Sequence, residues 1–472
     1  MLTHSTARSG RHAAGFACGA LLWVCALWPA GPVRAQDTPA HHAPDNIFDA
    51  YARWVVTKGA WGGATTPFPA TFARPPDEGH VARSWSEALT VHAPRELTEE
   101  RVHRTLEAAE RGVAWLREQG WPLPPPDGGR GGTPGFDLYL QPGTAAPDGY
   151  IDARVDVQSG VGAYDDAITH AVIDPAAPRL EACVLAAVLE ASLLALDPAE
   201  ALSWRRATAS YVAWLATGEF GCDGDGDADA QRLGADGLLL REPASATSGA
   251  LWLAILADRE DGSSGRFLRE LWQFARQRTR KMGPLRASPN LWEVLERSLE
   301  NADERFDDLA VDFAIARYFA GPPGRSARAP YPVLRSLPPE AAVQLEASVA
   351  AGDRARHVTL QHNLAPLGSS YVRVHVGGDL KPGDQLKVWL RAEQGPRWAL
   401  SAVRLAANGA EVGRLHAPVR TTPKSFLPLE LTAETHSVLL VVTHLPVKLE
   451  LLTREDQLAY GAKLIIDLER AR

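Results

Sequence analysis

The predicted fold is organised around an apolar run in the middle of the chain, Glu181-Ala-Cys-Val-Leu-Ala-Ala-Val-Leu-Glu-Ala-Ser-Leu-Leu-Ala-Leu196. It is apolar on nearly every side, which is typical of a helix that is buried all round. A second helix is expected directly after it, at 201–217. Glu190 lies inside the apolar run, where an unpaired carboxylate would cost several kcal/mol. The sequence therefore predicts two packed helices and one buried acid that needs a partner.

The flanking segments predict an α+β protein. Upstream, apolar residues at helical spacing predict a helix from Thr98 to just before Gly120, and short strands are expected at 136–141, 150–155 and 168–173. Downstream, further helices are expected at 248–258, 265–280, 288–301 and 306–319. From about Val358 the apolar period changes to two, with strands expected at 370–376, 385–392, 399–405, 426–431, 438–442, 447–452 and 463–468. Short strands at this spacing indicate a β-sandwich or jelly-roll domain.

Composition and the N-terminus indicate an exported globular protein. The 472 residues are 45% hydrophobic and 22% charged. Arg8 and Arg11 precede an apolar run of about 16 residues, too short to span a bilayer, and small residues precede a cleavage site after Ala35. Removing residues 1–35, which hold three Arg and no acid, changes the formal charge from -8 to -11. We expect a secreted or periplasmic protein with no membrane span after cleavage and no nucleic-acid partner.

Five segments follow from these patterns. They are a signal peptide at 1–35, an N-terminal extension at 36–95, a mainly helical middle domain with a small sheet at 96–320, a Pro-rich connector at 321–354 and a β-sandwich at 355–472.

The order of elements in the middle domain resembles that of the zincin metallopeptidases, in particular secreted bacterial putative metalloproteases with a C-terminal β-sandwich. Phe136-Asp-Leu-Tyr-Leu and Thr169-His-Ala-Val-Ile-Asp174 resemble the core strands of that family. Trp204-Arg-Arg-Ala-Thr-Ala-Ser210 lies where the family has Trp-x-x-Glu-Gly-x-Ala, and Ser248-Gly-Ala-Leu-Trp-Leu resembles its next helix. Pro366-Leu-Gly-Ser-Ser-Tyr-Val372 resembles the entry to its β-domain. The resemblance implies that 187–194 is the metal-binding helix.

The chain departs from the family at the metal. The zinc ligands of H-E-x-x-H become Leu189 and Leu193, and the third ligand, Glu, becomes Ala207; only the general-base position, Glu190, keeps its residue. Since zinc needs three protein ligands, the resemblance implies a metallopeptidase fold without zinc. We expect Glu190 to pair with Arg205 or Arg206, or alternatively to face solvent at the edge of its helix.

Other residues suggest smaller features. Cys183 and Cys222 remain after cleavage and are expected to pair, which would clamp the two helices together; the alternative is two separate buried thiols. Asp223, Asp225, Asp227 and Asp229 alternate as in calcium loops, although an acidic solvated loop fits them better, because Gly and Glu are missing from the EF-hand positions. No other cofactor is expected. His170 reads as a structural histidine, and Trp389 and Trp398 as core residues or a sugar- or peptide-binding platform.

These expectations favour a secreted, catalytically inactive metallopeptidase homologue that binds a protein or peptide, or acts structurally in the envelope or extracellular space. Two alternatives stay open. One is an active secreted hydrolase with a different site, for instance around His170, Glu190 and the acidic loop. The other is a surface or glycan-binding protein that works through the β-sandwich.

Overall fold

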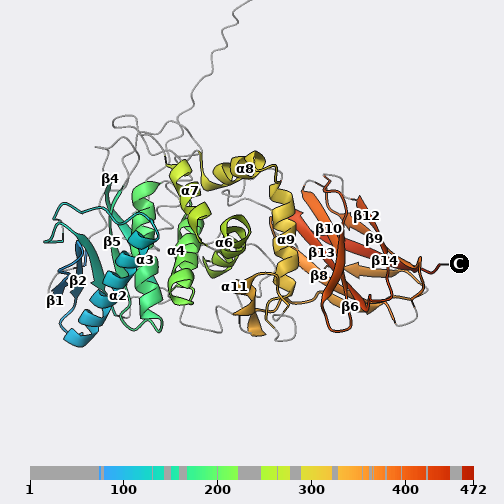
Figure 1. Ribbon diagram of the computed structural model, residues 1–472, viewed down its shortest axis with the longest axis horizontal. Coiled ribbons are helices and arrows are strands. Elements are labelled where there is room, and N and C mark those ends of the chain that lie inside the picture. Colours follow the sequence, from blue (N-terminus) through green and yellow to red (C-terminus); the bar gives the residue numbers. More distant parts are fainter. Residues whose placement is uncertain are drawn as a thin grey trace, which may run out of the picture. The chain divides into compact units, whose positions relative to one another are not determined.

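The computed structural model (Figure 1) describes residues 74–75, 79–129, 131–142, 150–158, 167–198, 200–221, 246–262, 264–276, 289–321, 328–337, 339–352, 354–360, 364, 366–377, 380–394, 396–420, 424–446 and 460–471. All of them belong to the unit formed by residues 45–472. The expected signal peptide, 1–35, lies outside the described residues. Their content of helices and sheets is that of an α+β protein, as the sequence predicts.

The middle domain contains a sheet of five described strands in the order β1-β2-β3-β5-β4. Strands β2, β3 and β5 run parallel, whereas β1 and β4 are antiparallel edge strands. The strands are β1 His80–Arg83, β2 Leu89–Ala93, β3 Phe136–Leu140, β4 Tyr150–Gln158 and β5 Ala167–Ile173. The last three were predicted. The first two fall in 36–95, so the sheet begins before residue 96, inside the segment expected as an extension.

The two faces of this sheet differ in chemistry because side chains alternate along each strand. One face carries Leu89, Val91, Leu138 and Ala171, which join the main apolar core with α2 and α3. The opposite face carries polar residues at the alternate positions, namely Thr90, His92, Asp137, Tyr139 and His170, all of them buried. The sheet thus separates a helix-covered apolar layer from a buried polar one.

The predicted helices are present with small shifts at their ends. They are α2 Glu99–Glu118, α3 Leu180–Leu196, α4 Leu202–Thr217, α6 Ala246–Asp261, α7 Arg266–Ala275, α8 Leu291–Asn301 and α9 Phe306–Tyr318, followed by the short α11 Pro332–Arg335. Thr98 caps α2 by accepting a hydrogen bond from the Arg101 amide, as its position predicted. Helix α7 ends at Ala275, five residues before its predicted end at 280. None of the described helices combines the length and apolar composition that crossing a membrane requires.

Two further sheets form the C-terminal domain, in the orders β11-β10-β13-β8-β6 and β12-β9-β14-β7. Apolar residues from both sheets form one core between them. The strands are β6 Ala347–Ala350, β7 Arg356–Thr359, β8 Ser369–His375, β9 Gln385–Ala392, β10 Arg397–Leu405, β11 Glu411–His416, β12 Lys424–Glu430, β13 Ser437–Leu445 and β14 Ala462–Glu469. Strand β6 lies in the expected connector, 321–354, and pairs with β8. The strand predicted at 447–452 lies outside the described residues.

The first of these sheets also packs against helix α9 through its outer face. Tyr371, Val403, Leu439 and Val441 on that face belong to the same apolar core as the helices. The hydroxyl of Tyr371 donates a hydrogen bond of 2.8 Å to the carbonyl oxygen of Ala314 in α9. The sandwich therefore depends on α9 to cover one of its two outer faces.

This dependence predicts how a shortened protein behaves. A fragment that starts at residue 355 lacks β6 and exposes the apolar face that α9 covers, so it should associate and bind a hydrophobic dye. A fragment that starts at residue 303 keeps α9 over this face, so the sandwich itself should be covered, and only the side of α9 that packs on α6 is newly exposed. Replacing Leu439 and Val441 by Thr in the shorter fragment should reduce its dye binding. A monomeric, dye-free short fragment would show that the contact with α9 is dispensable.

Candidate functional site

The positions that the resemblance assigns to zinc ligands lie in the main apolar core. Leu189 and Leu193 on α3 and Ala207 on α4 have no exposed surface. The two helices pack against each other, and α3 also contacts α2 and β5. Hydrocarbon side chains offer no lone pair to a metal ion, and their burial leaves no solvent-facing coordination position. These three residues therefore do not fit a zinc site.

Glu190 lies in the same core and has a charged partner. Its Oε1 lies 3.7 Å from Nη1 of Arg205 on α4, and neither side chain has exposed surface. The structure thus has the Glu190–Arg205 pair that the sequence suggested, and the alternative, a solvent-facing Glu190, is wrong. Arg206, the other suggested partner, is also buried, at 5% exposure. Because both charges of the pair are removed from water, removing either residue would leave the other charge in a site of low dielectric.

A second buried carboxylate lies at the start of α4. Glu200 accepts a hydrogen bond of 2.8 Å from the Ala201 amide and one of 2.7 Å from the Leu291 amide, so it joins the N-terminal ends of α4 and α8. Burial raises the pKa of Glu200 to about 7, an effect that these two amides and the charge of Arg205 only partly offset. Arg205 therefore interacts with two buried carboxylates. It pairs with Glu190 on α3, and its positive charge lowers the pKa of Glu200.

The remaining predicted site residues are only partly within the described chain. Cys183 is buried on α3 and is a disulfide cysteine. Cys222 lies outside the described residues, so the Cys183–Cys222 pairing stays a prediction. The calcium candidates Asp223, Asp225, Asp227 and Asp229 also lie outside them. Within the described ranges, no group of three or more His, Cys, Asp or Glu could hold a metal ion.

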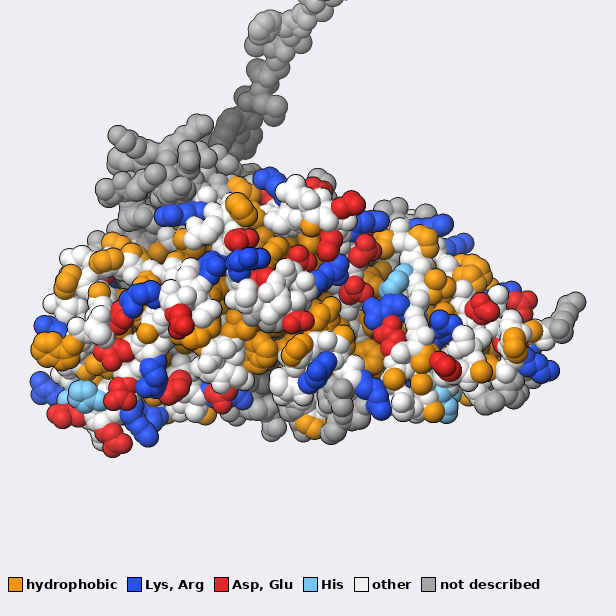
Figure 2. All heavy atoms as spheres, viewed as in Figure 1, with side chains coloured by type: hydrophobic (Ala, Val, Ile, Leu, Met, Phe, Trp, Pro, Cys, Tyr) orange, Lys and Arg blue, Asp and Glu red, His pale blue; other side chains and the backbone are white. Residues whose placement is uncertain are grey.

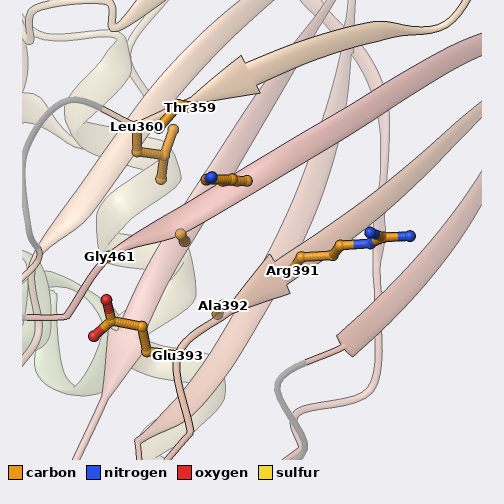
Figure 3. A pocket seen from close by; sticks show the side chains of 8 residues that line it. Thr359, Leu360, Arg391, Ala392, Glu393 and Gly461 are labelled. Atoms are coloured by element: carbon orange, nitrogen blue, oxygen red, sulfur yellow. The ribbon is translucent and has the colours of Figure 1, made fainter.

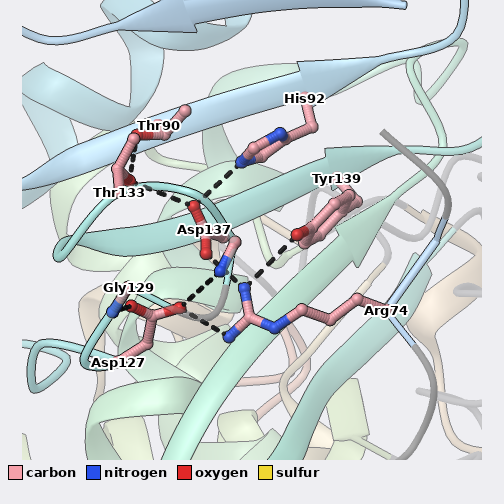
Figure 4. A network of polar contacts seen from close by, with 9 residues as sticks. Arg74, Thr90, His92, Asp127, Gly129, Thr133, Asp137 and Tyr139 are labelled. Atoms are coloured by element: carbon pink, nitrogen blue, oxygen red, sulfur yellow. Dashed lines mark hydrogen bonds and ion pairs between the residues drawn. The ribbon is translucent and has the colours of Figure 1, made fainter. Parts of the chain in front are cut away.

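A polar network on the other face of the sheet is the site that sequence reasoning missed (Figure 4). The guanidinium of Arg74 contacts Asp137 on β3 and lies 2.8 Å from Oδ2 of Asp127. Nε2 of His92 on β2 lies 2.9 Å from Oδ1 of Asp137. The ring of His92 stacks on Tyr139, with centroids 4.5 Å apart. One Arg, two carboxylates and one His thus meet over adjacent strands.

The pKa values of the two carboxylic acids in this network are shifted in opposite directions. Burial raises the pKa of Asp127, and the neighbouring Asp137 raises it further. Burial also opposes ionisation of Asp137, but its hydrogen bond to His92 and the charges of His92 and Arg74 outweigh that and lower the pKa of Asp137. Asp127 accepts hydrogen bonds from the amides of Gly129 and Gly131. The network therefore links Arg74 and Asp127 to Asp137 on the sheet.

A weak signal for this network exists in the sequence. Thr90 and His92 alternate with apolar residues, as do Asp137 and Tyr139, so each pair lies on one face of its strand. Alternation alone usually indicates a solvent-facing polar side. Only the pairing of β2 with β3 places His92 beside Asp137, and residues 36–95 gave no clear strand pattern.

Comparisons with known proteins do not name a family. No protein-family model matches the chain. No curated protein matches it either.

Among solved structures, the chain is similar to CorA, described as a surface-associated copper-binding protein important in Methylomicrobium album BG8 copper acquisition. The match covers 27% of this chain and 98% of the CorA chain, with 10% sequence identity and a TM-score of 0.19. The chain is similar over 25% of its length to the enzymatically active domain of bacteriophage CBA120 tailspike protein 4, at 15% identity, 18% of that chain and a TM-score of 0.17. The VP2 subviral particle of infectious bursal disease virus gives 13% identity, 25% of this chain, 32% of that chain and a TM-score of 0.17. Likenesses this weak carry no argument about function.

The buried pair predicts a non-additive response to substitution. Glu190→Met leaves a buried guanidinium without the carboxylate that lies 3.7 Å from it, and Arg205→Met leaves a buried carboxylate without that guanidinium, so each should cost about 3–5 kcal/mol of unfolding free energy. The double variant removes both charges and should be more stable than either single variant. Urea unfolding of the four proteins measures the coupling. Additive effects would show that the two charges do not depend on each other.

Glu200 predicts a pH dependence of stability. Its folded pKa of about 7 lies above the unfolded value, so the folded state holds its proton more tightly. The resulting stability is complete below about pH 4.5 and is lost as the pH rises through 7. Relative to Glu200→Gln, the wild-type unfolding free energy should fall by about 3 kcal/mol between these limits. The difference between the two denaturation curves isolates this group, and a constant difference across the range would contradict the prediction.

Proposed function

We propose that this protein is a secreted, catalytically inactive homologue of zincin metallopeptidases that acts by binding a protein or peptide, or structurally. The observation that carries the proposal is the content of the α3–α4 core. Apolar side chains occupy the three ligand positions, and the Glu190–Arg205 ion pair lies beside them. A peptidase of this kind needs an open metal position and a bound water. Here the equivalent space is filled by packed protein.

The arrangement of elements supports the resemblance on which this proposal rests. Helix α2 precedes the strands β3, β4 and β5; the chain then enters α3, and α4 packs against it. This is the order that the sequence patterns suggested for a zincin-like domain. The order of elements supports the resemblance in fold only. The function has to be argued from the residues of the site.

An active hydrolase with a different site is the alternative. His92 beside Asp137 is the described pair that resembles acid–base machinery, since a carboxylate can orient and charge a neighbouring imidazole. Its burial counts against it, because His92 is 2% exposed and Asp137 is not exposed at all. An acid–base pair must come within hydrogen-bond reach of its substrate, and these two side chains are closed off from solvent.

Metal analysis and a protease assay of the purified protein test the proposal directly. We expect substoichiometric zinc after dialysis and no chelator-sensitive hydrolysis of a denatured protein substrate. One zinc per chain together with chelator-sensitive proteolysis would overturn the assignment as an inactive homologue.

Restoring the motif tests the resemblance itself. The triple variant Leu189→His, Leu193→His, Ala207→Glu recreates two His one helical turn apart and a Glu on the adjacent helix, so it should bind about one zinc. A matched control, Leu189→His, Leu194→His, Ala207→Glu, introduces the same residues at a spacing that does not converge on one face of α3. Both variants are compared by zinc content in the monomer peak of gel filtration. Equal zinc contents in the two would refute the assigned positions.

A further inference from the structure

The outer face of the sheet β12-β9-β14-β7 is a surface of defined composition. Alternate residues of these strands point inward to the sandwich core, for example Leu386, Val388 and Leu390 of β9. The residues between them point outward and are exposed or half-buried. Helix α9 packs against the other sheet, through β10 and β13. The outward residues of the β12-β9-β14-β7 sheet therefore form a separate surface.

A row of three cations crosses this face. Arg391 on β9 is directly opposite Lys424 on β12 on one side and Lys463 on β14 on the other. All three side chains are exposed. Neighbouring strands lie about 4.8 Å apart, so the outer two Cα atoms of the row are separated by about 10 Å. We call these three residues the cation row.

This arrangement costs stability in the free protein, because like charges directly opposite each other on a sheet repel. Within the described part of the chain, no salt bridge or hydrogen bond involves the side chain of Arg391 or Lys463. By contrast, Lys387, farther along the same face of β9, forms an ion pair with Glu469. The fold thus neutralises a cation on the same face but leaves two members of the cation row available to an external anion.

An aromatic and apolar row lies next to the cation row. Trp389 is opposite Phe426 on one side and Ile465 on the other. The two aromatic rings lie 5.2 Å apart with planes inclined by 32°, and Phe426 is 45% exposed. Trp398, the other Trp considered from the sequence, is 1% exposed and belongs to the sandwich core. The aromatic residues on this outer face are therefore Trp389 and Phe426, and Trp398 does not contribute to it.

The cation row also borders a pocket of ≈ 400 Å³ at the end of β9 (Figure 3). Thr359, Arg391 and Lys463 line it on the side of the outer face, together with Glu393 and the backbone around Gly461. Figure 3 shows the side chains of Arg391 and Glu393 extending in different directions from the end of β9. Within the described residues no ion pair joins Glu393 to Arg391 or Lys463, and the pocket adds polar hydrogen-bonding groups beside the row.

We propose that this face binds an acidic polysaccharide that carries carboxylate groups on its sugar rings. A pyranose ring presents a flat array of C–H bonds that can pack on the exposed ring of Phe426 and the half-buried ring of Trp389 beside it. A carboxylate on the same or the next sugar pairs with Arg391 in the bidentate geometry that guanidinium groups favour, and Lys463 adds a second positive charge. The side-by-side rows match a ligand that is apolar on one face and charged at its edge. This inference does not depend on whether the α3–α4 core is an inactive metallopeptidase site.

The charge distribution favours this ligand over a nucleic acid. The whole chain has a formal charge of -8, and on the face shown in Figure 2 basic and acidic side chains are interspersed rather than gathered by sign. Nucleic-acid binding depends on many phosphate contacts distributed over a basic surface. A single row of three cations beside an aromatic pair fits a ligand with fewer and more widely spaced charges.

Titration calorimetry with oligogalacturonides, a uronic acid polymer of defined length, tests the proposal on the purified protein. We expect binding that weakens as ionic strength rises. The variant Arg391→Glu/Lys463→Glu should lose affinity by about tenfold or more, because it removes two charged contacts and adds repulsion. Phe426→Ala should weaken binding without changing its dependence on salt. Lys381→Glu, which reverses an exposed charge in the turn before β9, is the matched control and should bind like the wild type.

Each comparison ligand has a decisive outcome. Neutral malto-oligosaccharides should bind more weakly than oligogalacturonides, and equal binding would overturn the role of the cation row. Tighter binding of a single-stranded oligonucleotide would assign the face to nucleic acid instead. No binding of oligogalacturonides by the wild type, or unchanged binding in the double variant, would refute the proposal. Thermal unfolding of each variant checks that it is folded at the temperature of the titration, which excludes misfolding as the cause of a loss.

Discussion

Helix α3 is apolar around its whole circumference, and it escapes water only if other elements cover every side of it. The sheet covers it through β5, while α2 and α4 pack against it. Full burial of one Leu or Val side chain stabilises a protein by about 1.5–3 kcal/mol, so the many such residues on α3 make its surroundings the strongest constraint on the middle domain. The position of α4, and with it those of Arg205 and Glu200, follows from this requirement.

The same burial fixes the chemistry of the polar groups it encloses. A carboxylate on α3 has no access to water and must be matched, and Arg205 lies 3.7 Å away on the adjacent helix. Glu200, which is also buried, accepts hydrogen bonds from two backbone amides instead, and burial raises its pKa. On the far side of the sheet, Arg74 joins two carboxylates under similar burial. In these three places buried polar side chains link separate elements of the middle domain through ion pairs and hydrogen bonds.

Much of the fold could be predicted because its elements have clear periods. The helices at 99–118, 180–196 and 202–217 and the strand at 385–392 appear almost where the patterns placed them. Strands β1, β2, β6, β7 and β11 were missed. They have four to six residues each, and a strand this short is found from the sequence only where its alternation is as clear as in β3. The pairing of Glu190 with Arg205 or Arg206 was one of two expectations. A buried charge needs a partner, and the resemblance placed these two cations on the next helix, but only the structure excluded a solvent-facing Glu190. The network around Asp137 could not be predicted, because its members come from separate segments.

Residue types and local spacing were enough to predict the α+β class and the buried helix, and the side chains at 189, 193 and 207 are ones that cannot bind zinc. That His92 lies beside Asp137, that Trp398 is in the core, and that Lys424, Arg391 and Lys463 form one row became clear from the folded structure alone. Those facts depend on strand register and on which elements pair, and a shift of one residue would reverse the face on which each side chain lies. Register is set by contacts between distant parts of the chain, which local patterns do not contain.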